Sequence, residues 1–434
     1  MEIKNLNLLN ARVYDPLSNI NTTLDVFIRD GKILYECDNI DSKNIYTLNL
    51  KNHIIVPGFF DLRVHTRIPG NNSCEGIKSI SEAAARGGFT DILAMPDTLP
   101  AADNPGTIQY IKDRVEKQSL VKMWLAGCLT TGSKGESIAP LGSLKDAGVI
   151  AITDCPYSPN NNQIFINSIK YASMFDLPVI EFPFDRSFGS DNFTHESAYS
   201  LKLGIGGTPR IAEELAVQRA ISISKELDVN IHISSISTIN SVQLIRRAKE
   251  LNFKITTDVS VHHLLLNETA IEGYNTLAKL NPPLREEIDR NALVSGVCDG
   301  TIDAVTSAHN PYSLHEKQVE FDIAPSGAIG LEVCFSGLYE VLKKCHKDPL
   351  AQILNLLSYS PRRILQLKQN YMKSGATANF TVIALDKPLK YDLALGTSHS
   401  ENTPLNYKIF SASPILTIAD GLIAYKSNNI SDLS

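Results

Sequence analysis

The chain has 434 residues, of which 43% are hydrophobic and 20% charged, and its formal net charge is −6. This composition is typical of a globular protein, and the mildly acidic balance argues against a nucleic-acid or anionic-membrane partner. No apolar run reaches the length of a membrane span, and the N-terminus has no signal-peptide layout. The seven dispersed cysteines include no CxxC pair, which predicts reduced thiols in a cytoplasmic protein.

Both ends of the chain have the composition of β-strands. Residues 8–16, 24–36 and 45–56 are short runs rich in branched and aromatic residues, and Asp30-Gly31 supplies a turn between two of them. Residues 378–385 and 406–425 repeat this pattern near the other end. We therefore expect residues 1–56 and 376–434 to form one small β domain together.

Between these ends, short apolar runs alternate with helical, charged segments. Apolar runs of this length indicate parallel strands that are buried on both faces. Eight of them in succession, with helical crossovers, is the number that closes a (β/α)8 barrel, which we expect over residues 57–375. A doubly wound open sheet is the alternative that the pattern leaves open. The runs span residues 58–65, 90–97, 121–128, 148–154, 177–182, 229–234, 253–260 and 302–309.

Polar side chains gather at the predicted carboxyl ends of these runs. In such barrels the chemistry lies at that end of the strands. One histidine or aspartate at a strand end is more often structural than functional, but the set as a whole indicates a site. Its members are Arg63, His65, Asp97, Asp154, His232 and His309.

Nine segments in unbroken order resemble dihydroorotases of the amidohydrolase superfamily. They begin with PGFFDLRVHTRIPG and AMPDTLP and end with APSGAIGLE and SHSENTPL. Between these lie AITDCP, HISSIST, DVSVHHLLL, NPPLREEIDR and SAHNPYSLHEK. The similarity extends from about residue 8 to residue 426, and it implies the same barrel with a β domain.

The resemblance also implies a two-zinc site in which a bridging hydroxide attacks a cyclic amide and a strand-8 aspartate moves the proton. Three positions of that site keep a suitable residue, which makes His65, Asp154 and His232 the remaining metal ligands. Three positions have lost theirs, and these are Arg63, Phe182 and Ala308. Arginine is cationic and has no lone pair, phenylalanine is apolar, and alanine removes a ligand together with the general base. We therefore expect no catalytic residue and no zinc, although Cys155 or His262 near the site leaves a rebuilt centre open.

Substrate-binding positions of the family are better preserved. Arg67, Asn281 and His309 match them, whereas Asp97 stands where the family has an asparagine that contacts the substrate carboxylate. An additional carboxylate there disfavours an anionic ligand such as dihydroorotate.

Three functions follow as alternatives. The first is an inactive homologue with a structural or regulatory role, for which the resemblance implies aspartate carbamoyltransferase as partner, in a homo-oligomer. The second is an active dihydroorotase or related cyclic-amide hydrolase that uses a reduced or rebuilt zinc site. The third is a small-molecule sensor that uses the old pocket. The loss of ligands at positions 63 and 308, where Arg63 and Ala308 now stand, favours the first function over the second.

Overall fold

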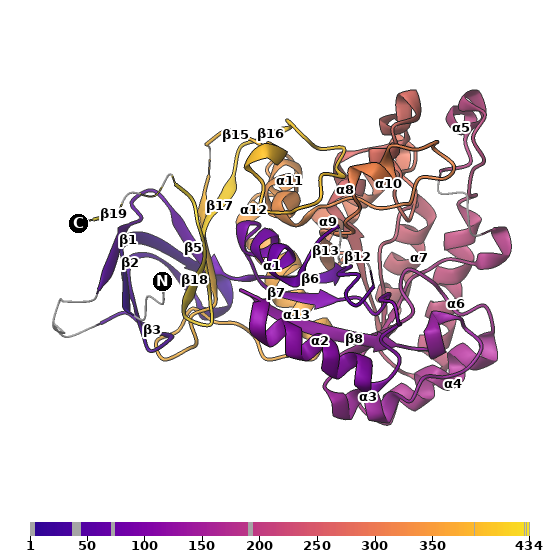
Figure 1. The fold of residues 1–434 in the computed structure, drawn as a ribbon, viewed down its shortest axis with the longest axis horizontal. Coiled ribbons are helices and arrows are strands. Elements are labelled where there is room, and N and C mark those ends of the chain that lie inside the picture. Colours follow the sequence, from indigo (N-terminus) through magenta and orange to yellow (C-terminus); the bar gives the residue numbers. More distant parts are fainter. Residues whose placement is uncertain are drawn as a thin grey trace.

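The computed structural model describes residues 5–36, 45–70, 74–189, 194–385, 387–428, 430 and 432–433. The two ends of the chain meet in one nine-stranded sheet beside the barrel (Figure 1). Strand β14 joins the two ends, because it pairs antiparallel with β5 and places Phe380 opposite Pro57. The strands are β1 (Asn5–Asp15), β2 (Ile20–Arg29), β3 (Lys32–Leu34), β4 (Tyr46–Asn49), β5 (Ile54–Pro57), β14 (Phe380–Ala384), β17 (Ser413–Ala419), β18 (Leu422–Lys426) and β19 (Asp432–Leu433).

This sheet has an apolar core of its own. Leu8, Val26, Ile55, Phe380 and Leu416 are all fully buried in it, and they come from both ends of the chain. Burial of such branched and aromatic side chains is what holds the two distant segments together. The predicted β domain from both termini is confirmed.

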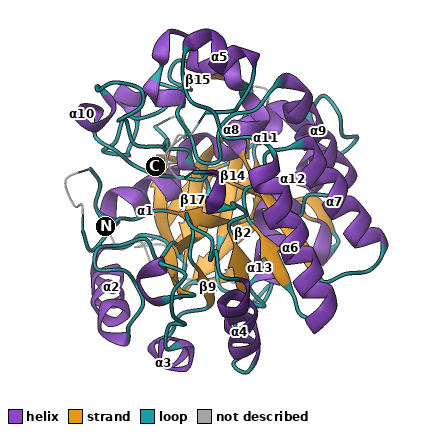
Figure 2. Cartoon of the chain, turned by 90° about the vertical axis from the view of Figure 1, so that its right-hand side faces the viewer, coloured by secondary structure: helices purple, strands orange, loops and turns teal. Residues whose placement is uncertain are grey.

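The middle of the chain forms eight parallel strands in sequential order, surrounded by helices (Figure 2). The expected (β/α)8 barrel is confirmed, and the open-sheet alternative is wrong. Each predicted run coincides with one strand, and β7 alone begins one residue before its run. The strands are β6 (Phe59–Val64), β7 (Phe89–Ala94), β8 (Lys122–Cys128), β9 (Ala151–Thr153), β10 (Val179–Glu181), β11 (Ile231–Ile233), β12 (Ile255–Ser260) and β13 (Ala304–Thr306).

Hydrogen bonds close the barrel between its first and last strands. The backbone N–H of His65 donates to the carbonyl of His309 at 2.8 Å. The buried Asp61 carboxylate accepts the backbone N–H groups of Arg63 at 2.9 Å and Ser307 at 3.0 Å. Burial raises the pKa of Asp61 to about 6. Barrel closure therefore fixes the backbone on both sides of Arg63 and His65.

Helices cover the outside of the barrel. Two of them, α6 and α7, match the helical segments expected from sequence. The helices are α1 (Ile77–Arg86), α2 (Pro105–Gln118), α3 (Leu141–Ala147), α4 (Asn162–Ser173), α5 (Ala198–Leu203), α6 (Ile211–Leu227), α7 (Ile239–Glu250), α8 (Val261–Leu265), α9 (Glu287–Asp299), α10 (Leu314–Lys317), α11 (Cys334–Leu342), α12 (Pro349–Leu354) and α13 (Ser360–Ile364).

The segment between β14 and β17 leaves the β domain and lies against the barrel. Its short strands β15 (Leu389–Lys390) and β16 (Ile409–Phe410) pair with each other. Tyr391 and Leu405 pack with Val333 in a small apolar cluster. The Asn402 side chain donates to the carbonyls of Asn310 at 3.0 Å and Gly327 at 3.1 Å. Part of the segment predicted for the β domain thus supports the barrel.

The structure corrects the expectation that all cysteines are unpaired thiols. Cys298 and Cys345 form a disulfide, 47 residues apart in the sequence. No motif in the sequence indicates this pair, because only the packing of α9 beside the segment after α11 brings the two cysteines together. The described residues Cys74, Cys128, Cys155 and Cys334 are buried and form no disulfide, and Cys37 lies outside the described residues. Among the described helices, none is long and apolar enough to span a membrane.

The apolar contact between β6 and α11 provides a test of the fold. The rings of Phe335 and Phe59 are fully buried and stack at 5.3 Å. We expect Phe335→Ala to lower the free energy of unfolding by about 3–5 kcal/mol, because it leaves a cavity behind the first barrel strand. Urea denaturation measures this, with the exposed Leu201→Ala as control, for which a change within about 0.5 kcal/mol is expected. A loss below about 1 kcal/mol for Phe335→Ala would contradict this packing.

Candidate functional site

Arg63 lies at the centre of the barrel mouth, at the end of β6, and only 3% of it is exposed. Its Nε donates to Nε2 of His65 at 3.2 Å, and its two terminal nitrogens donate to the hydroxyl of Ser235 at 2.5 Å and the carbonyl of Asn281 at 3.1 Å. The guanidinium also lies 4.9 Å from the centre of the Phe182 ring. Two positions where the family resemblance implies metal ligands thus hold a cation and the ring it packs against.

The contact with Arg63 decides the state of His65. Because arginine can only donate, the Nε2 atom of His65 must accept and cannot carry the proton. The proton is then on Nδ1, which donates to Asp97 at 2.7 Å. Burial lowers the pKa of His65 and outweighs the opposite effect of Asp97. His65 is therefore a neutral imidazole with its one lone pair already in use.

Asp154 is held by Thr130. Its two carboxylate oxygens accept from the backbone N–H of Thr130 at 2.9 Å and from the hydroxyl of Thr130 at 2.5 Å. Burial raises the pKa of Asp154 to about 6. Phe182 packs in the apolar interior of the barrel, together with Phe60 and Met95. Neither position offers the mouth a free ligand atom.

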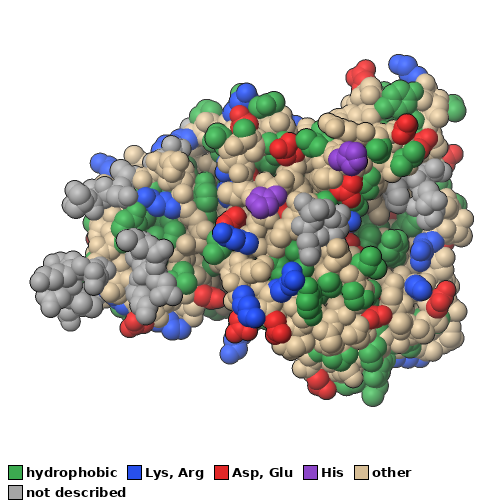
Figure 3. Space-filling view, viewed as in Figure 1, with side chains coloured by type: hydrophobic (Ala, Val, Ile, Leu, Met, Phe, Trp, Pro, Cys, Tyr) green, Lys and Arg blue, Asp and Glu red, His purple; other side chains and the backbone are tan. Residues whose placement is uncertain are grey.

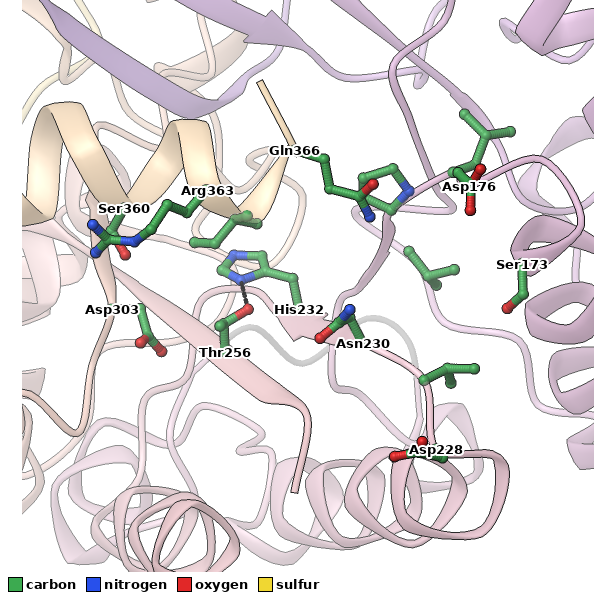
Figure 4. Close-up of a pocket in the computed structure, with 15 residues that line it drawn as sticks. Ser173, Asp176, Asp228, Asn230, His232, Thr256, Asp303, Ser360, Arg363 and Gln366 are labelled. Atoms are coloured by element: carbon green, nitrogen blue, oxygen red, sulfur yellow. Dashed lines mark hydrogen bonds between the residues drawn. The ribbon is translucent and has the colours of Figure 1, made fainter. Parts of the chain in front are cut away.

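His232 does not lie at the mouth, and this corrects the sequence-based placement. It is the middle residue of the three-residue strand β11, so it points into the barrel one layer below the strand ends. Its Nε2 pairs with Asp258 at 2.9 Å. Its Nδ1 lies 3.0 Å from the hydroxyl of Thr256 (Figure 4). It lines a cavity of about 370 Å³ at the opposite end of the barrel. The residue of this segment that reaches Arg63 is Ser235, three positions later.

Ala308 and His309, which follow the eighth barrel strand, also contribute no ligand atom to the mouth. Ala308 borders only a small enclosed space of about 10 Å³, beside His262 and His263. His309 points to Glu75, and its Nε2 lies 2.8 Å from the carboxylate. The other oxygen of Glu75 accepts the hydroxyl of Ser398 at 2.7 Å. His309 therefore anchors the C-terminal segment instead of lining the substrate cavity.

His262 and His263 are structural as well. They lie in helix α8 rather than on a strand, and both are buried. The Nε2 atoms of His262 and His263 contact the backbone carbonyls of Ile329 and Pro282, each at 3.2 Å. Burial lowers the pKa of His262 to about 4 and that of His263 to about 3.

The open part of the mouth is a cavity of about 440 Å³. Arg67, Asp97 and Asn281, three of the four predicted substrate-binding residues, line it together with Arg63. Arg67 donates to the side-chain oxygen of Asn310 at 2.8 Å and to the hydroxyl of Tyr312. Burial alone would raise the pKa of Asp97, but His65 and Arg67 together hold it below its ordinary value. This volume suits a small ligand.

A second cluster of ligand-type side chains lies outside the mouth. His195, Glu286 and Asp289 place one ligand atom each within 4.8 Å of one another. Arg285 donates to Nδ1 of His195 at 3.1 Å, so the proton of this histidine is on the nitrogen that faces the carboxylates. Arg210 already pairs with both Glu286 and Asp289. The cluster is an ion-pair network and does not fit a metal ion.

The residues at the mouth do not fit a two-zinc centre either. Zinc needs about three protein ligands with free lone pairs, and a neighbouring guanidinium repels a dication. Here the lone pair of His65 Nε2 accepts a hydrogen bond from Arg63, and both carboxylate oxygens of Asp154 accept hydrogen bonds from Thr130. His232 lies one layer too deep and pairs with Asp258.

Comparison with known proteins identifies the family. The family model described as "Dihydro-orotase-like" matches residues 52–241. The dihydroorotase of Citrifermentans bemidjiense is 34% identical over 425 residues, which cover 98% of this chain and all of the relative. The dihydroorotase of Carboxydothermus hydrogenoformans is 36% identical over 404 residues, 93% of this chain and 94% of the relative. The chain belongs to the dihydroorotase family. It is thus a homologue of the dihydroorotases of pyrimidine biosynthesis.

Solved structures show the same fold at lower identity. The L-hydantoinase (dihydropyrimidinase) of Arthrobacter aurescens superimposes on this dihydroorotase homologue with a TM-score of 0.84 at 19% identity, over 99% of this chain and 98% of the other. The dihydropyrimidinase of Brevibacillus agri gives 0.83 at 16% identity, over 99% and 96%. The barrel and β domain are therefore shared with these proteins.

Sequence analysis did not identify some residues of the mouth. Ser235, Asn310, Tyr312 and Ser326 contact Arg63 or Arg67 or line the cavity. Asn310 and Tyr312 lie in the segment SAHNPYSLHEK, which carried the family resemblance. The positions next to Ala308 were therefore a usable signal, whereas Ser235 has no distinguishing pattern.

The occupied lone pairs predict little zinc at the mouth. Protein purified without chelator and equilibrated with micromolar zinc should hold well below one equivalent, as measured by plasma mass spectrometry. Arg63→Ala frees Nε2 of His65 and removes the cation, so its zinc content should rise, whereas Arg246→Ala, which breaks a surface ion pair with Asp299, should leave it unchanged. About two equivalents in the unmodified protein, lost on His65→Ala, would overturn this assignment.

Proposed function

We propose that this dihydroorotase homologue does not hydrolyse dihydroorotate and acts in pyrimidine biosynthesis as a metal-free binding partner. The observation that carries this proposal is the hydrogen bond from Arg63 to Nε2 of His65 at 3.2 Å. Without a metal there is no activated hydroxide, and without a carboxylate at position 308 there is no proton shuttle. The chain nevertheless retains the complete barrel and β domain, which supports a role in which its surface binds a partner.

The partner that we propose is aspartate carbamoyltransferase, with the chain itself in a homo-oligomer. The family resemblance supports this choice. Acidic and basic side chains are interspersed on the face shown in Figure 3, which supports a protein partner over a polyanion. The ribbon β15–β16 and the segment that connects its strands supply a candidate contact surface, because Ile409 in β16 is 66% exposed and Leu395 in the connection is 68% exposed.

An active dihydroorotase or related cyclic-amide hydrolase with a rebuilt zinc site is the second candidate. The names of the relatives favour it, since the two compared above are both called dihydroorotase and match over almost their full length. It requires Arg63 to leave the lone pair of His65, and activity measurements separate the two candidates.

Turnover is the first test. The purified chain should hydrolyse dihydroorotate at least about a hundredfold more slowly than a relative with the full ligand set, since loss of the general base alone costs about 10²–10⁴ in rate. The assay measures release or consumption of carbamoyl aspartate with added zinc. A sample treated with chelator, which holds no metal, serves as the inactive control. Turnover comparable to that of the relative would refute the proposal.

Reintroducing the lost ligands tests whether their absence is the reason that the mouth does not bind zinc. Arg63→His, Phe182→His and Ala308→Asp together should recover zinc binding only weakly, because His232 lies below the mouth. Adding Ser235→His should raise the zinc content further, since the hydroxyl of Ser235 lies 2.5 Å from Arg63. Ser235→His alone is the matched control and should bind no more zinc than the unmodified chain. Equal zinc content in the triple and quadruple variants would contradict this placement.

Co-purification tests the partner. A stable interface buries on the order of 1,200 Å² or more, so a complex should survive gel filtration at micromolar concentration. The tagged chain, expressed in its own cell, should bring down aspartate carbamoyltransferase in a complex larger than the monomer. Ile409→Glu should weaken the complex, whereas Leu422→Glu on β18, at a residue that is 47% exposed, should not. A lone monomer without the transcarbamoylase would refute the partner.

A further inference from the structure

The mouth cavity contains a buried positive charge without a carboxylate partner. Among the described residues, no carboxylate lies within ion-pair distance of Arg63, although the residue is only 3% exposed. Its bonds to His65, Ser235 and Asn281 use three of the five N–H groups that a guanidinium has. A buried charge without a direct ion pair is costly, and the buried carboxylate of Asp258 lies beyond Ser235, so the side of Arg63 that faces the cavity is suited to an anion.

A second guanidinium lines the same cavity. Arg67 uses its Nε and one terminal nitrogen on Asn310 and Tyr312. Its ring contact with Tyr312, at 3.9 Å from the ring centre, fixes the plane of the guanidinium. The mouth thus presents two oriented cations, and arginine binds carboxylates in this way.

The cavity wall also holds polar atoms that have no partner. The Oδ1 atom of Asp97 and the hydroxyl oxygen of Ser326 are buried and make no hydrogen bond within the described part of the chain. Both residues line the cavity. Since buried polar groups are nearly always satisfied, these atoms indicate that a ligand supplies the missing partners. Asp97 is ionised beside His65 and Arg67, so it can only accept a hydrogen bond, and its partner must be a donor.

We propose that the mouth cavity binds a small dicarboxylate that carries an amino group, of the acidic amino acid class, and holds it without turnover. Two guanidiniums and one carboxylate leave one net positive charge, which a ligand with two carboxylates and one ammonium neutralises. The carboxylates pair with Arg63 and Arg67, and the ammonium donates to Oδ1 of Asp97. The proposal rests on the proposed function in one respect, namely that Arg63 stands in place of metal and leaves the ligand intact.

The cavity of about 370 Å³ that His232 lines lacks these features. At the opposite end of the barrel, Asp303 pairs with Lys249 at 2.6 Å and Asp228 with Lys254 at 2.8 Å. His232 also has both ring nitrogens engaged there. Two of the carboxylates that line that cavity are thus already paired with lysines, whereas neither Arg63 nor Arg67 forms an ion pair with a carboxylate of the described residues.

Two ligands that differ only in the amino group test the proposal. Calorimetric titration of the full chain at pH 7.5 should show L-aspartate binding at least about tenfold more tightly than succinate, because a hydrogen bond to a charged group contributes about 1.5–3 kcal/mol. Equal affinities, or no binding of L-aspartate at millimolar concentration, would overturn the proposal.

Variants assign the contacts. Asp97→Asn should abolish the preference for L-aspartate while retaining succinate, and Arg67→Gln should weaken both ligands about tenfold or more. The matched controls are Asp299→Asn and Arg246→Gln, which break a surface ion pair far from the mouth and should change neither affinity. Arg63→Gln is a second cation variant, and thermal denaturation of each variant shows that it is folded. Unchanged affinities in folded Asp97→Asn and Arg67→Gln would contradict the assignment.

Turnover in the same samples separates this proposal from the proposed function. If dihydroorotate is hydrolysed at the rate of an active relative, the proposed function fails whatever the titration gives. If no turnover occurs and L-aspartate does not bind, the ligand proposal alone fails.

Discussion

The hydrogen bond from Arg63 to His65 is the interaction on which the rest of the barrel mouth depends. A guanidinium cannot accept, so its contact with Nε2 fixes the tautomer of His65, and that tautomer in turn donates to Asp97. Placing a full charge at this depth has a free-energy cost. The cost is offset by the hydroxyl of Ser235, a backbone carbonyl and the face of Phe182.

This arrangement makes the three lost ligands interdependent. An aromatic ring at position 182 would leave a metal without a nitrogen ligand, but it gives a guanidinium a surface to pack on. The space beside Ala308 is only about 10 Å³, room for about one water molecule. The mouth has therefore been rebuilt around a fixed cation, and it is not simply a zinc site with parts removed. The remaining open volume lies on the side of Arg67 and Asp97.

The surrounding fold holds this cation in place from two directions. Asp61 and the bond between His65 and His309 close the barrel directly beside Arg63. The C-terminal segment adds a second support, because Glu75 links His309 to Ser398 and Asn402 holds the backbone after strand β13. A residue predicted for substrate binding, His309, thus serves the packing of the segment that carries the exposed ribbon β15–β16.

The sequence by itself determined the architecture and the chemical losses. Eight apolar runs gave eight strands, because parallel strands buried on both faces leave a continuous hydrophobic signal. Arg63, Phe182 and Ala308 could be recognised as unfit for metal from their side chains alone. Only the tertiary structure decided which residues meet. His232 and Ser235 are three residues apart, yet one lies a layer below the mouth and the other contacts Arg63, since a shift of a few residues along a strand moves a side chain to another layer. The same holds for the disulfide of Cys298 and Cys345 and for the ion-pair network around His195, whose members come from distant segments. Spacing in the sequence does not encode such contacts, because they arise from the packing of helices and loops around the closed barrel.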